Sequence, residues 1–111
     1  MFPGMETWDI ASLAVAPHHP EVLRTDPEAR VIAINLPAGD ELQEHQVHER
    51  AWVMVAGGEV EFEQDGSKVA GGPGFVAHFE PRERHEVRAV SDARLLLVLA
   101  PWPGEGHPSQ R

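Results

Sequence analysis

The sequence predicts an all-β fold, a small antiparallel β-barrel or sandwich built from seven or eight short strands. Ten glycines and ten prolines among 111 residues supply frequent points of chain reversal. Apolar residues gather in short runs, spaced about 8 to 12 residues apart, which is typical of such folds. No segment shows the apolar periodicity of a convincing helix, and no internal repeat indicates a solenoid or propeller.

The composition excludes several classes of function. Nine basic residues against eighteen acidic ones give a net charge of −9, and no basic cluster could hold nucleic acid. The longest apolar run, 95–101, is far shorter than a membrane span, and the N-terminal region lacks a secretory signal pattern. The absence of cysteine excludes disulfides, cysteine–metal sites and thiol nucleophiles. We therefore expect a cytoplasmic protein without nucleic-acid or membrane partners.

The first predicted unit, residues 1–28, is an N-terminal arm or edge strand, because several prolines interrupt any longer element. The barrel itself is predicted over 29–100. Its first strand covers 29–36, where β-branched residues favour a pleated surface, and a Pro-Ala-Gly-Asp turn ends that strand.

A polar segment, 41–50, separates this strand from the apolar run 51–56, which fits a strand covered on both sides. Residues 59–64 alternate glutamates with Val60 and Phe62, the pattern of a half-buried strand. Asp65-Gly66 then predicts a hairpin turn into a return strand over 67–70.

Three further strands complete the predicted barrel, each preceded by turn residues. They cover 75–79, 85–90 and 94–100. The remaining segment, 101–111, is a Pro- and Gly-rich C-terminal tail that we expect to be extended or disordered. Trp102, between two prolines, either caps the barrel or joins a subunit contact.

Seven histidines in so short a chain are the feature that most needs an explanation. His18, His19 and His107 lie in a proline-flanked loop and in the tail, where a solvent-exposed imidazole is the simplest interpretation. The other four lie at or beside strand ends. They are His45, His48, His78 and His85.

Imidazole is the commonest nitrogen ligand of transition metals, so convergence of these histidines would make a metal site. On a regular strand His45 and His48 would face opposite sides, but a bulge at 46–47 would return them to one face. His85 joins them if its strand pairs close to theirs.

The spacing of the glycines and histidines resembles the two motifs of the cupin superfamily. The first motif corresponds to Gly39, five residues, His45, then His48, Glu49 and Gly57-Gly58, and the second to the stretch from Gly74 to His85. The resemblance covers about two thirds of the chain and implies a small single-domain cupin with the RmlC-like jelly-roll barrel. The motifs are degenerate, since Val47 takes the place of the family's second histidine and Ala89 that of its final asparagine.

The resemblance also implies a site inside the barrel. A divalent transition metal (Fe, Zn, Mn or Ni) would be held by His45, His48 and His85, with Glu49 as a further ligand. The alternative is a barrel without metal, in which these histidines are polar pocket residues. We expect a small-molecule ligand to contact His78, Trp52, Met54 and Phe79, although barrel-lining aromatic residues are more commonly core.

Two functions follow from this resemblance. One is a metal-dependent enzyme of dioxygenase or isomerase type acting on a small organic substrate, for which Glu49, Glu83 and His78 are the available acid–base groups and the sequence selects none of them. The other is a non-catalytic ligand-binding or sensory module. We expect a homodimer formed by pairing of sheet edges, because a small barrel leaves edges unprotected.

Overall fold

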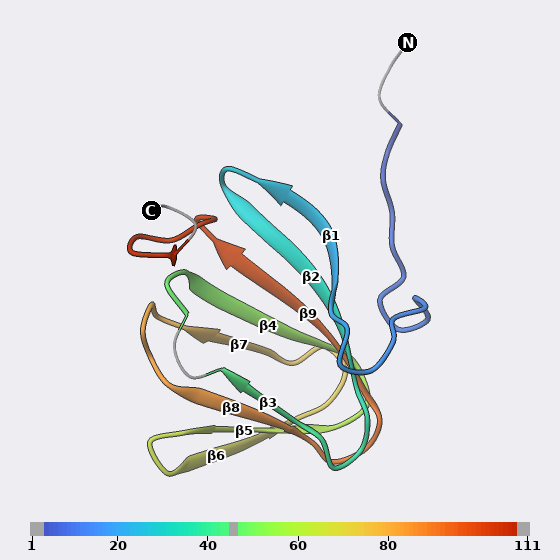
Figure 1. Ribbon diagram of the computed structural model, residues 1–111. Helices are drawn as coiled ribbons and strands as arrows, with labels where there is room; N and C mark the ends of the chain where they lie inside the picture. The colour runs from blue at the N-terminus through green and yellow to red at the C-terminus, as the bar shows by residue number, and fades with distance from the viewer. Residues whose placement is uncertain (1–3, 45–46, 109–111) are drawn as a thin grey trace.

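The computed structural model describes residues 4–44 and 47–108, except for the side chains of Gln43 and Glu44 (Figure 1). Its strands are β1 (Glu21–Asp26), β2 (Ala29–Leu36), β3 (Glu41–Glu44), β4 (Arg50–Gly57), β5 (Val60–Gln64), β6 (Ser67–Gly71), β7 (Val76–Phe79), β8 (His85–Ala89) and β9 (Ala93–Ala100). The prediction of an all-β fold is confirmed. The strands predicted from 29 to 100 lie within a residue or two of the observed ones, and β3 falls in the segment interpreted only as polar.

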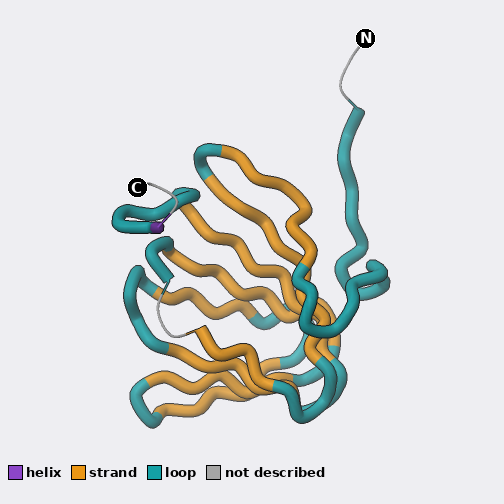
Figure 2. The backbone as a smooth tube through the Cα atoms, in the orientation of Figure 1, coloured by secondary structure: helices purple, strands orange, loops and turns teal. Residues whose placement is uncertain are grey.

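Two antiparallel sheets face each other across the core (Figure 2). The five-stranded sheet has the order β1-β2-β9-β4-β7, and the four-stranded sheet has the order β3-β8-β5-β6. Most neighbours within a sheet are distant in sequence, because the chain crosses repeatedly from one sheet to the other. This is the jelly-roll arrangement, in which β6 and β7 are edge strands of different sheets.

The core fills the space between the two inner faces. Alternation along β9 buries Leu95, Leu97 and Leu99, while residues between them face outward. Val53 and Val55 of β4 extend the same layer, and Val60, Phe62 and Val87 contribute the facing layer from the four-stranded sheet. Tight alternation of this kind fixes the register, since a one-residue slip would turn the apolar set outward.

The turns at one end of the barrel are joined by hydrogen bonds between distant segments. The backbone N–H of Glu59 donates to Ser91 Oγ at 3.0 Å, and the N–H of Ala38 donates to Asp92 Oδ1 at 2.9 Å. The N–H of Val90 donates to the Glu59 carbonyl at 2.8 Å. These bonds tie three chain reversals together, so this end of the barrel is closed.

In the described ranges, 4–44 and 47–108, the model contains no helix that is long and apolar enough to cross a membrane.

Candidate functional site

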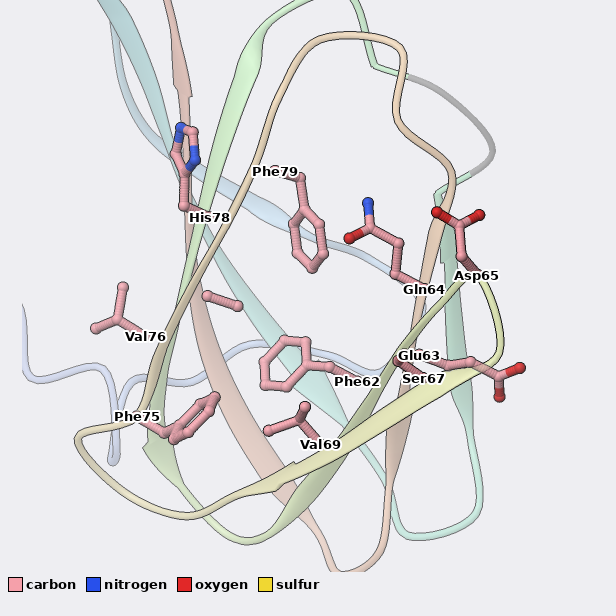
Figure 3. Close-up of a pocket in the computed structure, with 11 residues that line it drawn as sticks. Phe62, Glu63, Gln64, Asp65, Ser67, Val69, Phe75, Val76, His78 and Phe79 are labelled. Carbon is pink, nitrogen blue, oxygen red and sulfur yellow. The ribbon is translucent and has the colours of Figure 1, made fainter.

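A pocket of about 420 Å³ opens between the β5–β6 hairpin and strand β7 (Figure 3). It lies where the edges of the two sheets meet without pairing, so side chains rather than backbone close the seam. Its lining residues are Phe62, Glu63, Gln64, Asp65, Ser67, Val69, Phe75, Val76, Ala77, His78 and Phe79. This volume falls in the range of sites for small organic molecules.

Three phenylalanines form the apolar wall of this pocket. The ring of Phe62 stacks on Phe75, with the ring centroids 5.7 Å apart, and lies at 6.3 Å from the ring of Phe79. In Figure 3 all three rings face the pocket, whereas Val76 and His78 project from the other side of β7. Aromatic rings in this arrangement offer a flat apolar ligand both buried area and stacking contacts.

Polar groups lie at the hairpin end of the pocket. Figure 3 shows the Gln64 amide directed toward the Phe79 ring, while the carboxylates of Glu63 and Asp65 point away from the rings. An amide offers both a donor and an acceptor. The two carboxylates give the entrance a negative field that disfavours anionic ligands.

His85 lies directly behind the apolar wall. Its imidazole is only 3% exposed and stacks on Phe79 with a centroid separation of 3.8 Å and an interplanar angle of 5°. Nδ1 lies 3.4 Å from the backbone carbonyl oxygen of Glu83. Burial lowers the pKa of His85 below its usual value, because removal from water disfavours the imidazolium.

This depressed pKa predicts a loss of stability in mild acid. Above about pH 6.5 the imidazole is neutral in both folded and unfolded chains, so it adds no pH dependence. Below that pH the unfolded chain binds the proton first, and stability falls at up to about 1.4 kcal/mol per pH unit until the folded-state pKa is reached. Urea unfolding of metal-free protein between pH 8 and pH 5.5 should show this fall. The fall should be smaller in His85→Gln, and an equal slope in that variant would contradict the assignment.

The three expected metal ligands that the structure describes, His48, Glu49 and His85, do not form one group. His45 lies outside the described residues. The carboxylate of Glu49, 2% exposed, accepts a hydrogen bond from the Gly104 N–H at 2.7 Å. The ring of His48 lies against His107, with centroids 5.6 Å apart, and its Nδ1 is buried without a hydrogen-bond partner. Among the described residues no three histidine, aspartate or glutamate side chains gather where they could hold a metal ion.

Val47, rather than His48, packs against the hydrophobic core. The Val47 carbonyl also accepts a hydrogen bond from the backbone N–H of Arg82 at 2.8 Å, which fixes this loop against the turn after β7. Val47 is the position at which the cupin motif has its second histidine. An apolar residue there leaves His48 facing the C-terminal segment.

The C-terminal segment folds back onto the barrel instead of extending from it. The Arg30 guanidinium lies 4.0 Å from the centroid of the Trp102 ring. The ring centroids of Trp102 and His107 are 4.7 Å apart. Arg82 Nη2 donates to the carbonyl of Glu105 at 3.3 Å. Residues 102–107 therefore lie over the loop that contains His48 and Glu49, and we call this segment the cap.

The four predicted ligand-contacting residues divide between two faces. Phe79 is buried and lines the pocket. Trp52 is 47% exposed on the outer face of the five-stranded sheet, where its ring lies 4.4 Å from that of His78. Met54 is on the same outer face, because it alternates with the buried Val53 and Val55. His78 is exposed but reaches the rim of the pocket.

The sequence analysis treated barrel-lining aromatic residues in general as core and assigned no role to Gln64 or Gly104. Only the sheet order, in which β7 is an edge strand, shows that Phe75 and Phe79 border an unpaired seam. Nothing local marks Gly104, because its partner Glu49 is 55 residues away.

The cupin domain family matches residues 32–100. An RmlC-like cupin protein from Desulfovibrio desulfuricans shares 25% identity over 88% of this chain and 98% of its own, with a TM-score of 0.76. A cupin superfamily protein from Desulfitobacterium hafniense has the same TM-score at 14% identity, over 88% of this chain and 93% of its own.

An RmlC-like cupin with a double-stranded β-helix fold, from Methanocaldococcus jannaschii, has a TM-score of 0.69 at 17% identity. It covers 76% of this chain and 80% of its own. No curated protein matches the chain. The family match spans more than half of the chain, and the structural matches extend over both sheets, so the protein belongs to the cupin domain family.

Proposed function

We propose that this cupin binds a small, uncharged organic molecule with a flat apolar part in the pocket between β5, β6 and β7. The observation that carries the proposal is the wall formed by Phe62, Phe75 and Phe79 at an unpaired seam between the sheets. The apolar part would stack on these rings, and the Gln64 amide would bond to a polar substituent. Glu63 and Asp65 select against anions.

A neutral fluorescent probe, N-phenyl-1-naphthylamine, tests the pocket directly. We expect saturable binding of one probe per chain with a rise in fluorescence, since the dye brightens when it leaves water. Val69→Glu should reduce the affinity at least about 10-fold, because it introduces a charge beside the rings. Val69 is 50% exposed, so the substitution does not disturb the core.

The matched control is Val90→Glu, which places the same charge at a 55% exposed valine that does not line the pocket. This variant should bind the probe like the wild type. Absence of saturable binding, or equal affinity in the Val69→Glu and Val90→Glu variants, would reject the pocket as a ligand site. If the probe binds in this pocket, compounds that displace it would identify the ligand class.

A divalent transition metal is the second candidate. It is favoured by one observation, the position of His85, whose imidazole is 3% exposed on the inward face of β8. His85 also pairs in register with Glu44, the residue before His45. His48 and Glu49 do not fit a site shared with His85, since both face the cap.

This candidate, and with it any dioxygenase- or isomerase-type activity, therefore depends on His45 and His85. Elemental analysis of protein grown with added iron, zinc, manganese and nickel is the test. Metal near one equivalent that is lost in His85→Gln but kept in Glu49→Gln would support it. Metal retained in His85→Gln would refute a role for that residue.

A further inference from the structure

One edge of the five-stranded sheet lacks the features that normally keep a sheet edge from pairing. Strand β7 is the last strand of that sheet, and no strand in the described part of the chain pairs with its second side. Its sequence, Val76-Ala77-His78-Phe79, contains no proline, lysine, arginine, aspartate or glutamate. Its register with β4 runs without a shift from the pair Ala51–Phe79 to the pair Met54–Val76. Such an edge is a template for a further strand.

The other three edges of the two described sheets are protected. Strand β1 has a register shift between Val22 and Arg24, and Arg24 pairs with Asp26. Strand β3 is four residues long and begins and ends with a glutamate. On β6, Lys68 Nζ lies 3.9 Å from Glu63 Oε1. Bulges and charged side chains discourage strand addition, so β7 is the edge that differs.

The backbone groups of Val76 and His78 point to this free edge. Just before β7, the Phe75 carbonyl accepts a hydrogen bond from the backbone of β4 at 2.8 Å. Hydrogen-bonded positions of an antiparallel pair recur at every second residue, so the next such positions are Ala77 and Phe79. The N–H and C=O groups of the two residues that alternate with them face away from β4. An added strand can therefore bond to both of those residues.

The geometry points to an extended peptide as the occupant of this edge, added to β7 as a further antiparallel strand with one aromatic side chain in the pocket. Residues of an added strand opposite Ala77 and Phe79 share the inward face with them. That face borders the pocket, where the rings of Phe62, Phe75 and Phe79 form the apolar wall. The inference rests on the proposed function, because the aromatic side chain would contact the same three rings.

The charge around the pocket selects a second residue of the peptide. Glu63 and Asp65 lie at the hairpin end, on the Phe79 side of the pocket (Figure 3). An antiparallel strand passes Phe79 before it passes Ala77, so the residue opposite Phe79 comes two positions before the aromatic residue. A lysine or arginine there lies nearest the two carboxylates, and the chain's charge of −9 attracts a basic peptide. The expected recognition sequence is a basic residue, any residue, then an aromatic residue.

Isothermal titration calorimetry with the peptide acetyl-Thr-Arg-Thr-Phe-Thr-amide tests this inference. The wild type should bind one peptide per chain. The same peptide with glutamate in place of arginine should bind at least about 10-fold more weakly, because its charge is repelled by the carboxylates at the hairpin end.

Two N-methylated forms of the arginine peptide provide a matched pair. Methylation of the central threonine removes the N–H that faces His78 and should weaken binding at least about 10-fold. Methylation of the phenylalanine removes an N–H that faces away from β7 and should leave the affinity unchanged. Equal affinities of the two methylated peptides would overturn the proposal, because binding would then not depend on pairing with β7.

The variant Val76→Pro tests where the peptide binds. It removes an N–H from the free edge at the first residue of an edge strand, where proline is tolerated. Peptide binding should weaken at least about 10-fold, since the peptide loses a main-chain hydrogen bond. Circular dichroism should show the fold of the wild type. Unchanged peptide affinity in this variant would place the peptide elsewhere and overturn the proposal.

The neutral fluorescent probe separates this inference from the function on which it rests. The arginine peptide should displace bound N-phenyl-1-naphthylamine, because both need the three phenylalanine rings. Saturable binding of the probe without binding of the peptide would reject strand addition alone. Absence of binding by both would reject the pocket as a ligand site as well.

Discussion

Replacing Gly58 with alanine should destabilise the barrel by about 3 kcal/mol or more, a large part of the roughly 5–15 kcal/mol by which a small domain is stable. Gly58 has a φ of +77°, which an L-residue adopts only at a cost. A β-carbon there would lie 2.1 Å from the carbonyl oxygen of Asp92 and 2.8 Å from Ala93 Cα. Both neighbours are backbone atoms, so no side-chain rotation can relieve the contact.

The variant Gly66→Ala separates the two causes of the expected destabilisation, backbone strain and steric overlap. Gly66 has a similar φ of +81°, but a β-carbon there meets nothing within 4 Å. Its substitution should therefore cost only the backbone strain, about 1 to 2 kcal/mol. Urea unfolding of both variants measures the difference. Equal losses would mean that the turn around Gly58 relaxes and that its close approach to Asp92 is unimportant.

Glycines such as Gly58, together with the periodicity of the segments between them, explain why the strands could be predicted from the sequence. Gly58, Gly66 and Gly74 mark reversals whose conformations only glycine adopts cheaply, and the segments between them have the two-residue periodicity of strands. Turn chemistry and periodicity are both local, so they appear in the sequence directly. The pairing of β2 with β9, more than 50 residues apart, entered only through the family resemblance.

The site was less predictable because its geometry depends on contacts between distant segments. The direction in which His48 and Glu49 face is decided by residues 102–107, which the sequence marks only as rich in proline and glycine. Trp52 and Phe79 are both apolar and both lie on paired strands, yet one faces outward and the other inward. Periodicity gives the alternation within a strand, but the sheet order decides which side is the core.

Gly104→Ala should release the cap, with a loss of at least about 2 kcal/mol. A β-carbon on Gly104 would lie 1.9 Å from the carbonyl oxygen of His48, so the cap could not keep its position against the loop. The buried Glu49 carboxylate would then lose the N–H that satisfies it. Hydrogen exchange should show faster exchange in residues 102–107, while the strands keep their protection.

Glu49 provides the reciprocal test of the same contact. Glu49→Ala should cost about 2 kcal/mol, because it leaves the buried Gly104 N–H without an acceptor. Glu49→Gln keeps an oxygen there and should cost less, about 1 kcal/mol, since the hydrogen bond to a carboxylate is the stronger one. If the two residues act through one contact, the double variant Glu49→Ala/Gly104→Ala should lose less than the sum of its single losses. Gly4→Ala, at a position with nothing within 4 Å, should leave stability unchanged. Additive losses of stability in the double variant would show that the cap and Glu49 contribute independently to stability. The Glu49 carboxylate would then again be a candidate metal ligand.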